Sequence, residues 1–361
     1  MRSKRSQCRP VKRCIFFFTA ITILPLALVY LATSNDQFYR IRSPISENGN
    51  STQLMAEELP KRALSQSEME MIEARMAQRN ERLAEKCTEF GLDVHGNDSW
   101  HQPNPWEFLV NRKYHIIWCN VFKSASTSWM YNFNILAGYS PEFLKKSNAV
   151  PLELARKKYP RVSQGELEKA MNDSTTFLIV RHPFERLLSA YKDKLLYAVP
   201  HSLHDKLGHK IIKRYRKKKK NVTYPKCPTF SEFISFILDE VKKKNALDMH
   251  WTPITKFCTP CQVKFDIVAK FETLDEDQRY LITKANLNSI IKPEWKNYGK
   301  GRNTQDLVAK YYSQLTREQL DGIFEFFRYD FELFDYSSDE YFKLELVTNN
   351  EPSSEYKDKT N

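Results

Sequence analysis

Three apolar runs in the chain have the length and composition of buried strands, and helical patterns separate them. The runs are YHIIWCNV (114–121), TTFLIV (175–180) and KFDIVAKF (264–271). Between them, residues 184–197 and 229–244 show the apolar spacing of amphipathic helices. Uninterrupted apolar strands that alternate with helices are typical of sheets covered on both faces. The pattern therefore predicts an α/β fold with a central parallel sheet flanked by helices.

The N-terminal segment predicts a membrane anchor. Residues 1–14 contain six Lys or Arg and no acid, and residues 15–33 are uncharged and long enough to cross a bilayer. The basic flank predicts a cytosolic tail at 1–14, a transmembrane signal anchor at 15–33 and a lumenal remainder. A cleaved signal peptide is the alternative, because YLATSN offers small residues near a suitable cleavage position. The length of the apolar run favours the uncleaved type II anchor.

The predicted anchor is followed by a stem, a globular domain and a tail. Residues 34–86 are predicted to form the stem, which ends in a run of helix formers at 65–87. The loose apolar spacing of that run fits a stem helix, a self-association helix that makes a homodimer, or the first helix of the globular domain. Composition indicates a lumenal domain at 87–345 and a disordered tail at 346–361.

Two further features agree with a lumenal location. Four glycosylation sequons follow the predicted anchor, and they begin at Asn50, Asn97, Asn172 and Asn221. Five cysteines also follow it: Cys87, Cys119, Cys227, Cys258 and Cys261. The last two form a lone CxxC without the second pair that a zinc site needs, so structural disulfides are expected in an oxidising lumen, with the pairing left open.

The net charge of +12 is concentrated in two segments. The N-terminal tail is one of them, and KIIKRYRKKKK (210–220), with eight Lys or Arg, is the other. In the cytosol such a segment would indicate nucleic-acid binding. In the lumen it indicates an acidic polysaccharide and no nucleic acid, and we expect an exposed loop beside the acceptor. A solvated loop without a partner is the alternative.

A polar stretch, FKSASTSWM (122–130), joins the first predicted strand to the helix that follows it. A helix N-terminus presents unpaired backbone N–H groups and the positive end of the helix dipole, which together bind phosphate. Lys123 adds a positive charge there, and hydroxyl groups come from Ser124, Ser126, Thr127 and Ser128. Residues 97–137 contain no glycine, so a GxxxxGK[ST] nucleotide loop is excluded. An ordinary capped helix is the alternative.

The stretch FLIVRHPFERLLSAYKDKL (177–195) repeats this pattern of strand, turn and helix. Arg181 ends the strand, and Ser189 follows two turns into the helix, on the side expected to face Arg181. A guanidinium and a hydroxyl in this arrangement would hold a second phosphate.

Two phosphate sites of this kind resemble those of the sulfotransferases, whose donor is 3′-phosphoadenosine 5′-phosphosulfate (PAPS). The motif VRHPFERLLSAY (180–191) is similar to a highly specific pattern of that family. The blocks at 249–277 and 329–336 narrow the resemblance to Golgi carbohydrate sulfotransferases of the HNK-1 type, which include the chondroitin and dermatan 4-O-sulfotransferases. The first loop differs from the family's P-K-V-A-C-T-N-W-K at every second position, which marks a divergent member.

The resemblance implies a P-loop-kinase-like sulfotransferase fold in the Golgi membrane and a donor site on two loops. The first loop, from Lys123 through Ser124, Ala125, Ser126 and Thr127 to Ser128, would bind the 5′-phosphosulfate. Arg181 and Ser189 would bind the 3′-phosphate. The expected reaction is sulfuryl transfer to the 4-hydroxyl of N-acetylgalactosamine in chondroitin. Dermatan, glucuronate and N-glycan acceptors, or a catalytically silent polysaccharide-binding protein, are the alternatives.

The resemblance also suggests which residues carry the chemistry. Lys123 is expected to neutralise charge on the leaving group. His250 is the favoured general base, because histidine accepts protons near neutral pH and this one lies in a block shared with the family. The alternative bases are His182, His115, Glu185 and Glu272. The reaction requires no metal, and the sequence contains no convincing ligand cluster. Trp129 is expected in the core.

Overall fold

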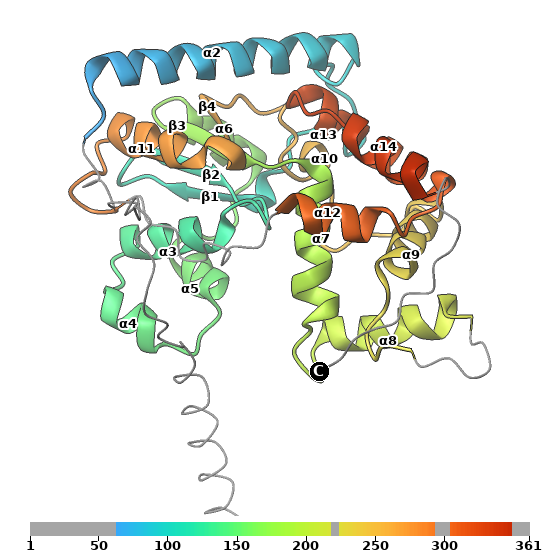
Figure 1. Cartoon of the computed structure of the whole chain (residues 1–361). Helices are drawn as coiled ribbons and strands as arrows, with labels where there is room; N and C mark the ends of the chain where they lie inside the picture. The colour runs from blue at the N-terminus through green and yellow to red at the C-terminus, as the bar shows by residue number, and fades with distance from the viewer. Residues whose placement is uncertain (1–62, 218–223, 293–303, 349–361) are drawn as a thin grey trace, which may run out of the picture. The chain divides into compact units, whose positions relative to one another are not determined.

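The computed structural model describes residues 63–217, 224–292 and 304–348 (Figure 1). The predicted cytosolic tail, anchor, most of the stem and nearly all of the C-terminal tail lie outside these ranges, as do two of the sequons. Within them, no helix has the length and apolar character needed to cross a bilayer.

Four strands form the central sheet in the order β1-β2-β3-β4. They are β1 (Phe108–Asn111), β2 (Ile116–Cys119), β3 (Thr175–Val180) and β4 (Ile267–Lys270). The last three pair in parallel, as expected, but β1 pairs with β2 antiparallel. The sheet is therefore mixed, and the prediction of a parallel sheet is wrong at this edge. The turn between β1 and β2 is too short for the crossover that parallel strands require.

Helices cover both faces of the sheet because its strands are apolar on both sides. In β3, Phe177 and Ile179 pack on one face, whereas Leu178 and Val180 pack on the other. The first face is covered by α3 (Ser126–Leu136), α5 (Pro151–Lys158) and α11 (Leu274–Lys284). The second face is covered by α6 (Gln164–Met171) and α10 (Ile254–Cys258). The α/β fold with flanking helices is thus confirmed.

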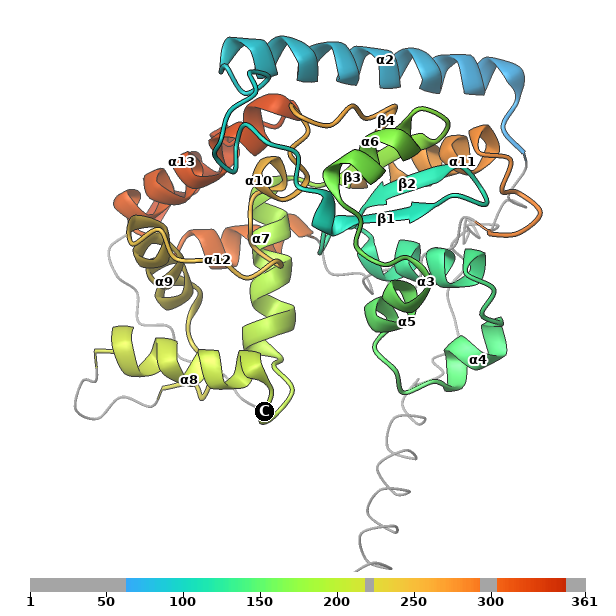
Figure 2. The ribbon, with the colours of Figure 1, turned by 180° about the vertical axis from the view of Figure 1, so that it is seen from behind.

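Helix α2 (Gln66–Glu89) lies along β4, at the outer edge of the sheet (Figures 1 and 2). Its Arg79 and Asn80 side chains donate hydrogen bonds to the carbonyl oxygens of Val268 (2.9 Å) and Asp266 (3.0 Å). The helix thereby covers an edge strand that would otherwise leave backbone groups unpaired. Its Ile72 side chain is buried in the core. Of the three alternatives, this packing favours the first helix of the globular domain.

The remaining helices form a second, aromatic-rich core beside the sheet. It includes Phe184, Phe230, Phe233 and Phe331. Figures 1 and 2 show these helices on the side away from α3, α5 and the short helix α4 (Pro141–Lys146). They are α7 (Pro183–Tyr191) with a π-helical turn at Lys192–Leu196, α8 (Leu203–Tyr215), α9 (Phe230–Lys242), α12 (Thr304–Tyr312), α13 (Arg317–Leu333) and α14 (Asp339–Thr348).

Two disulfides join α2 and β2 to the segment that begins at the last residue of α10. Cys87 at the end of α2 pairs with Cys261, and Cys119 at the end of β2 pairs with Cys258. The expectation of structural disulfides is confirmed, and the two cysteines of the CxxC have different partners. Cys227 is half-buried and unpaired with any cysteine of the described chain.

A buried carboxylate attaches α2 to α11. The fully buried Asp277 accepts hydrogen bonds from Arg75 (2.8 Å) and Arg79 (2.7 Å) of α2. It also accepts from the Thr273 hydroxyl at 2.7 Å and from the Lys270 backbone N–H at 2.9 Å. Removing this charge leaves the largely buried guanidinium of Arg79 without the carboxylate of its ion pair.

We predict that Asp277→Asn lowers the free energy of unfolding by about 3 kcal/mol, because one member of a buried ion pair is lost. Thermal unfolding of the purified protein measures the change. Asp275→Asn is the matched control, since Asp275 lies on the same helix but is 63% exposed. Equal melting temperatures for the two variants would show that α2 is not held by this carboxylate.

Candidate active site

The loop between β2 and α3 has an unusual backbone for a segment without glycine. Lys123 and Ala125 both have left-handed conformations, with φ of 68° and 56°. Such conformations cost about 1–3 kcal/mol each in non-glycine residues and concentrate at ligand sites. Turns of this kind direct successive backbone N–H groups towards one point and bind anions. Ala125 is also the N-cap of α3 and has no side chain to cap the first turn.

The hydroxyl groups of this loop differ in burial. Ser124 is fully buried, and its Oγ has no hydrogen-bond partner within the described chain. Ser128 is also buried, Ser126 is half-buried and Thr127 is exposed. Trp129 packs in the core with its ring centroid 4.7 Å from that of Phe177, so the interpretation of Trp129 as a core residue is confirmed.

Lys123 is paired with a carboxylate from the π-helical turn after α7. Its Nζ lies 3.1 Å from Oδ2 of Asp193, which also contacts Lys194 at 3.1 Å. Burial lowers the pKa of Lys123, and the charge of Asp193 opposes that effect. Single π-helical turns within helices occur frequently at functional sites. Sequence reasoning missed Asp193, because a lysine-flanked aspartate at the end of a helix resembles an ordinary surface residue.

Arg181 connects the two predicted phosphate loops. Its guanidinium donates to the carbonyl oxygen of Lys123 at 3.3 Å and to Glu185 at 3.1 Å, and it stacks over the Phe271 ring at 4.3 Å. Ser189 is half-buried one turn beyond Glu185 on the same face of α7. In the described residues no hydrogen bond joins Arg181 to Ser189. The two residues therefore share a face without a hydrogen bond between them.

Arg186, one turn into α7, brings the His250 segment to the first loop. It is fully buried and donates to three carbonyl oxygens, those of Phe122 (3.5 Å), His250 (3.3 Å) and Thr252. Burial lowers its pKa to about 10. The Phe122 and His250 rings also lie in contact, with centroids 4.8 Å apart. His250 is thus next to the loop that contains Lys123.

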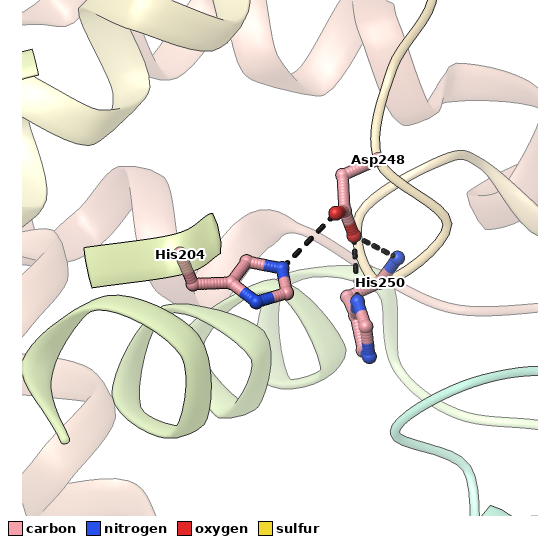
Figure 3. A group of neighbouring side chains, drawn as sticks. All are labelled: His204, Asp248 and His250. Carbon is pink, nitrogen blue, oxygen red and sulfur yellow. Dashed lines mark hydrogen bonds and ion pairs between the residues drawn. The ribbon is translucent and has the colours of Figure 1, made fainter. Parts of the chain in front are cut away.

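His250 belongs to a compact group with Asp248 and His204 (Figure 3). The Nδ1 atom of His250 lies 2.6 Å from Oδ1 of Asp248, and Nε2 of His204 lies 3.0 Å from Oδ2. Burial would raise the pKa of Asp248, but hydrogen bonds from both histidines outweigh it and hold this pKa well below its usual range. Burial lowers the pKa of His250, with Asp248 opposing, and the lowered pKa favours the neutral ring.

This group has three potential metal ligands, which the sequence did not reveal. Their donor atoms lie within 4.8 Å of one another. Direct hydrogen bonds already join them, however, so the side chains are satisfied without an ion. The group could not be predicted from the sequence, because His204 and Asp248 are far apart in the chain and come together only when α8 packs beside the loop before α10.

The model of the sulfotransferase family matches residues 106–337, which include both loops and the His250 segment. The chain belongs to the sulfotransferase family. The resemblance inferred from its motifs is therefore confirmed, and so is the expectation of a PAPS-dependent sulfotransferase. No solved structure matches the chain.

Related sulfotransferases with curated names act on carbohydrates. The chain is 30% identical over 251 residues to carbohydrate sulfotransferase 11 of Rattus norvegicus. The aligned region covers 67% of this chain and 71% of the relative. It is 30% identical over 264 residues to carbohydrate sulfotransferase 9 of Homo sapiens, an alignment that covers 71% of this chain and 58% of the relative. Carbohydrate sulfotransferase 10 of Danio rerio is 27% identical over 252 residues, covering 64% and 67%. The acceptor class is therefore a carbohydrate.

The sulfotransferase fold leaves the other histidine candidates for the base poorly positioned. His182 is buried, with its ring bonded to the Ser337 carbonyl at 2.9 Å and close to the Tyr341 hydroxyl at 3.4 Å. Burial lowers its pKa. His115 directly precedes β2, at the opposite end of the strand from Lys123, in a hollow of about 1160 Å³, where it pairs with Asp173. Neither ring faces the loop that contains Lys123.

The two acidic candidates are already engaged. Glu272 accepts hydrogen bonds from the backbone N–H of His182 at 3.0 Å and from the Tyr336 hydroxyl at 2.8 Å. Glu185 holds Arg181. His250 is therefore the candidate base whose ring lies beside the first loop.

We predict that Lys123→Ala lowers the turnover number at least about 100-fold, because a preorganised donor to the leaving group is lost. Radiolabelled PAPS measures the transfer, and the far-ultraviolet circular dichroism spectrum reports folding. Lys145→Ala, on the exposed surface of α4, is the control and should behave as wild type. Wild-type turnover in the Lys123 variant would exclude this lysine from the reaction.

Proposed function

We propose that the enzyme transfers a sulfuryl group from PAPS to the 4-hydroxyl of N-acetylgalactosamine in chondroitin. It would act in the Golgi lumen as a single-pass type II membrane protein. The observation that carries the choice of a polyanionic acceptor is a row of exposed lysines on α8, the helix whose first turn contacts Asp248. The motifs shared with the chondroitin and dermatan 4-O-sulfotransferases support the choice of hydroxyl.

The donor fits the two loops by charge and by donor chemistry. The left-handed backbone at Lys123 and Ala125 and the uncapped start of α3 suit the 5′-phosphosulfate, with hydroxyl groups from Ser124 to Ser128 around it. Arg181 and Ser189 suit the 3′-phosphate. Lys123 and Arg181 each hold a carboxylate in this structure, Asp193 and Glu185, and the phosphates of PAPS would replace those partners.

The reaction is an in-line displacement at sulfur. The acceptor oxygen forms a bond to sulfur while the bond from sulfur to the bridging oxygen breaks, and 3′,5′-adenosine bisphosphate leaves. His250 takes the proton of the attacking hydroxyl, which its neutral ring allows at pH 7. Lys123 neutralises the charge that grows on the bridging oxygen. No step in this account requires a metal.

The lysine row consists of Lys206, Lys210 and Lys213. The spacing of four and then three residues returns each side chain to the same face of a helix, and all three are exposed. The row spans about 10 Å, given the rise of 1.5 Å per residue. The opposite face of α8 carries His204 and the buried Ile211. A polyanion along this row would therefore lie on the helix that also contacts the Asp248 carboxylate.

The basic segment 210–220 differs from the exposed loop expected from its sequence. Residues up to Tyr215 belong to α8, and Lys218–Lys220 lie outside the described residues. Arg214 is paired with Asp239 at 2.6 Å. Arg216 is paired with Glu232 at 2.8 Å and is only 5% exposed. These two arginines therefore stabilise the packing of α8 on α9. The exposed lysines of the row are the residues of α8 that would bind the acceptor.

A panel of desulfated polysaccharides and labelled PAPS tests the proposed acceptor. We expect transfer to desulfated chondroitin, with the product label on the 4-position of N-acetylgalactosamine. Transfer only to dermatan, to glucuronate or to N-glycans would change the acceptor and retain the chemistry. Binding to immobilised adenosine bisphosphate without transfer to any member of the panel would indicate the silent polysaccharide-binding protein.

We predict that replacing Lys206, Lys210 and Lys213 with Gln raises the Michaelis constant for the polyanionic acceptor several-fold at low salt. The dependence of this constant on salt should also weaken, because fewer counterions are released on binding. The Michaelis constant for PAPS should not change.

A matched control removes the same charge elsewhere. Lys157, Lys169 and Lys264 are exposed and lie on α5, on α6 and just before β4, and their replacement with Gln should leave both Michaelis constants unchanged. If the two triple variants have the same acceptor Michaelis constant at low and at moderate salt, the lysine row is a solvated surface and not a binding site.

A further inference from the structure

The carboxylate of Asp248 determines which nitrogen of His250 carries a proton. An ionised carboxylate can only accept hydrogen bonds. Its Oδ1 atom faces both Nδ1 of His250, at 2.6 Å, and the His250 backbone N–H, at 2.9 Å. The Nδ1 atom must therefore be the protonated one. In the neutral ring the lone pair is then on Nε2, which Figure 3 shows on the side away from Asp248.

The second oxygen of Asp248 is held from another element. Oδ2 accepts from Nε2 of His204, in the first turn of α8, at 3.0 Å. The His204 and His250 rings also approach edge to face, with centroids 5.4 Å apart. Side-chain exposures of 12% for His250, 22% for His204 and 29% for Asp248 limit the competition from water. The carboxylate is thus fixed at both oxygens, and its plane sets the orientation of the His250 ring.

We propose that Asp248 and His204 are positioning residues for the sulfuryl-transfer reaction. Asp248 fixes the tautomer and orientation of His250, and His204 fixes Asp248. This inference rests on the proposed role of His250 as the base. It implies that α8 contributes to the reaction through the histidine in its first turn.

The same three side chains would behave differently as a metal site. A cation bound to Nδ1 of His250 would displace the proton from that nitrogen and leave the N–H on Nε2. The ring could then no longer accept a proton at Nε2. If the group is only hydrogen-bonded, a chelator should leave activity unchanged. If it holds a metal, a chelator should abolish activity.

The first variant is Asp248→Asn, which keeps the size of the side chain and removes its charge. We expect the turnover number to fall on the order of 100-fold, within the range that general-base catalysis contributes. The Michaelis constant for PAPS and the affinity for adenosine bisphosphate should remain close to wild type, because the donor loops are not altered. Retained bisphosphate binding also shows that the variant is folded.

The pH profile separates a positioning role from a merely structural one. His250 accepts a proton only when neutral, so the turnover number rises as pH increases through its pKa. Asp248 raises this pKa, whereas burial and the charges of Lys194 and His204 lower it. Two other groups face His250: Arg186 donates a hydrogen bond to its backbone carbonyl, and the uncharged Phe122 ring contacts its imidazole. Without the Asp248 charge the pKa falls further, so the rising limb should move to lower pH in Asp248→Asn.

His204 is tested with two substitutions and a control on the same helix. His204→Ala should lower the turnover number about tenfold, the effect expected from the loss of one hydrogen bond to a charged group. His204→Gln keeps an N–H donor and should recover most of that loss. His209→Ala removes an exposed histidine of α8 and should leave turnover unchanged.

The outcomes distinguish this inference from the proposed function. If wild-type enzyme sulfates no acceptor, the proposed function fails first. If wild type is active, an unshifted pH limb in Asp248→Asn, or loss of activity solely through the Michaelis constant for PAPS, overturns the inference. Loss of wild-type activity after dialysis against a chelator, with recovery on adding Zn²⁺, overturns it in favour of a metal site. Full activity in the chelator, together with the shifted limb, supports it.

Discussion

One buried guanidinium holds the two halves of the active site together. Arg186 is buried, and its guanidinium donates hydrogen bonds to the backbone carbonyls of Phe122, His250 and Thr252. A buried carbonyl without a donor costs about 1–3 kcal/mol, so loss of this side chain would leave several such groups unsatisfied. Because Arg186 belongs to α7, a rigid helix and not a loop sets the distance between the donor site and His250.

The sequence predicted the parts of the fold that depend on local pattern. The runs at 175–180 and 229–244 were found within two residues at either end, because their apolar periodicity is strong. It did not predict β1 (Phe108–Asn111), which is too short to show a periodicity and is defined only by its pairing with β2. Nor could it decide the role of α2, because the contacts that attach this helix to β4 and α11 are distant in the sequence.

The site residues that could be predicted from the sequence were likewise those in contiguous motifs. Lys123, Arg181 and Ser189 belong to contiguous motifs, so their types and spacing could be recognised in the sequence. Asp248 is two residues from His250, but an aspartate in a polar loop is common and indicates no particular role. Its second histidine partner, His204, comes from α8, so the sequence alone could not show that contact. The left-handed backbone of the first loop was also hidden, because such conformations are usually signalled by glycine, which the loop lacks.

The pairing of the cysteines has a consequence for how the chain matures. The two bridges are nested, so Cys87 and Cys119 are synthesised 174 and 139 residues before their partners. Of the other cysteines in the described chain, only Cys227 is synthesised before those partners, and a premature bond among these three must be reversed by thiol–disulfide exchange. Both native bonds take their second thiol from the segment 258–261, which follows β3 in the chain. Neither bond can therefore form until three of the four strands have been synthesised.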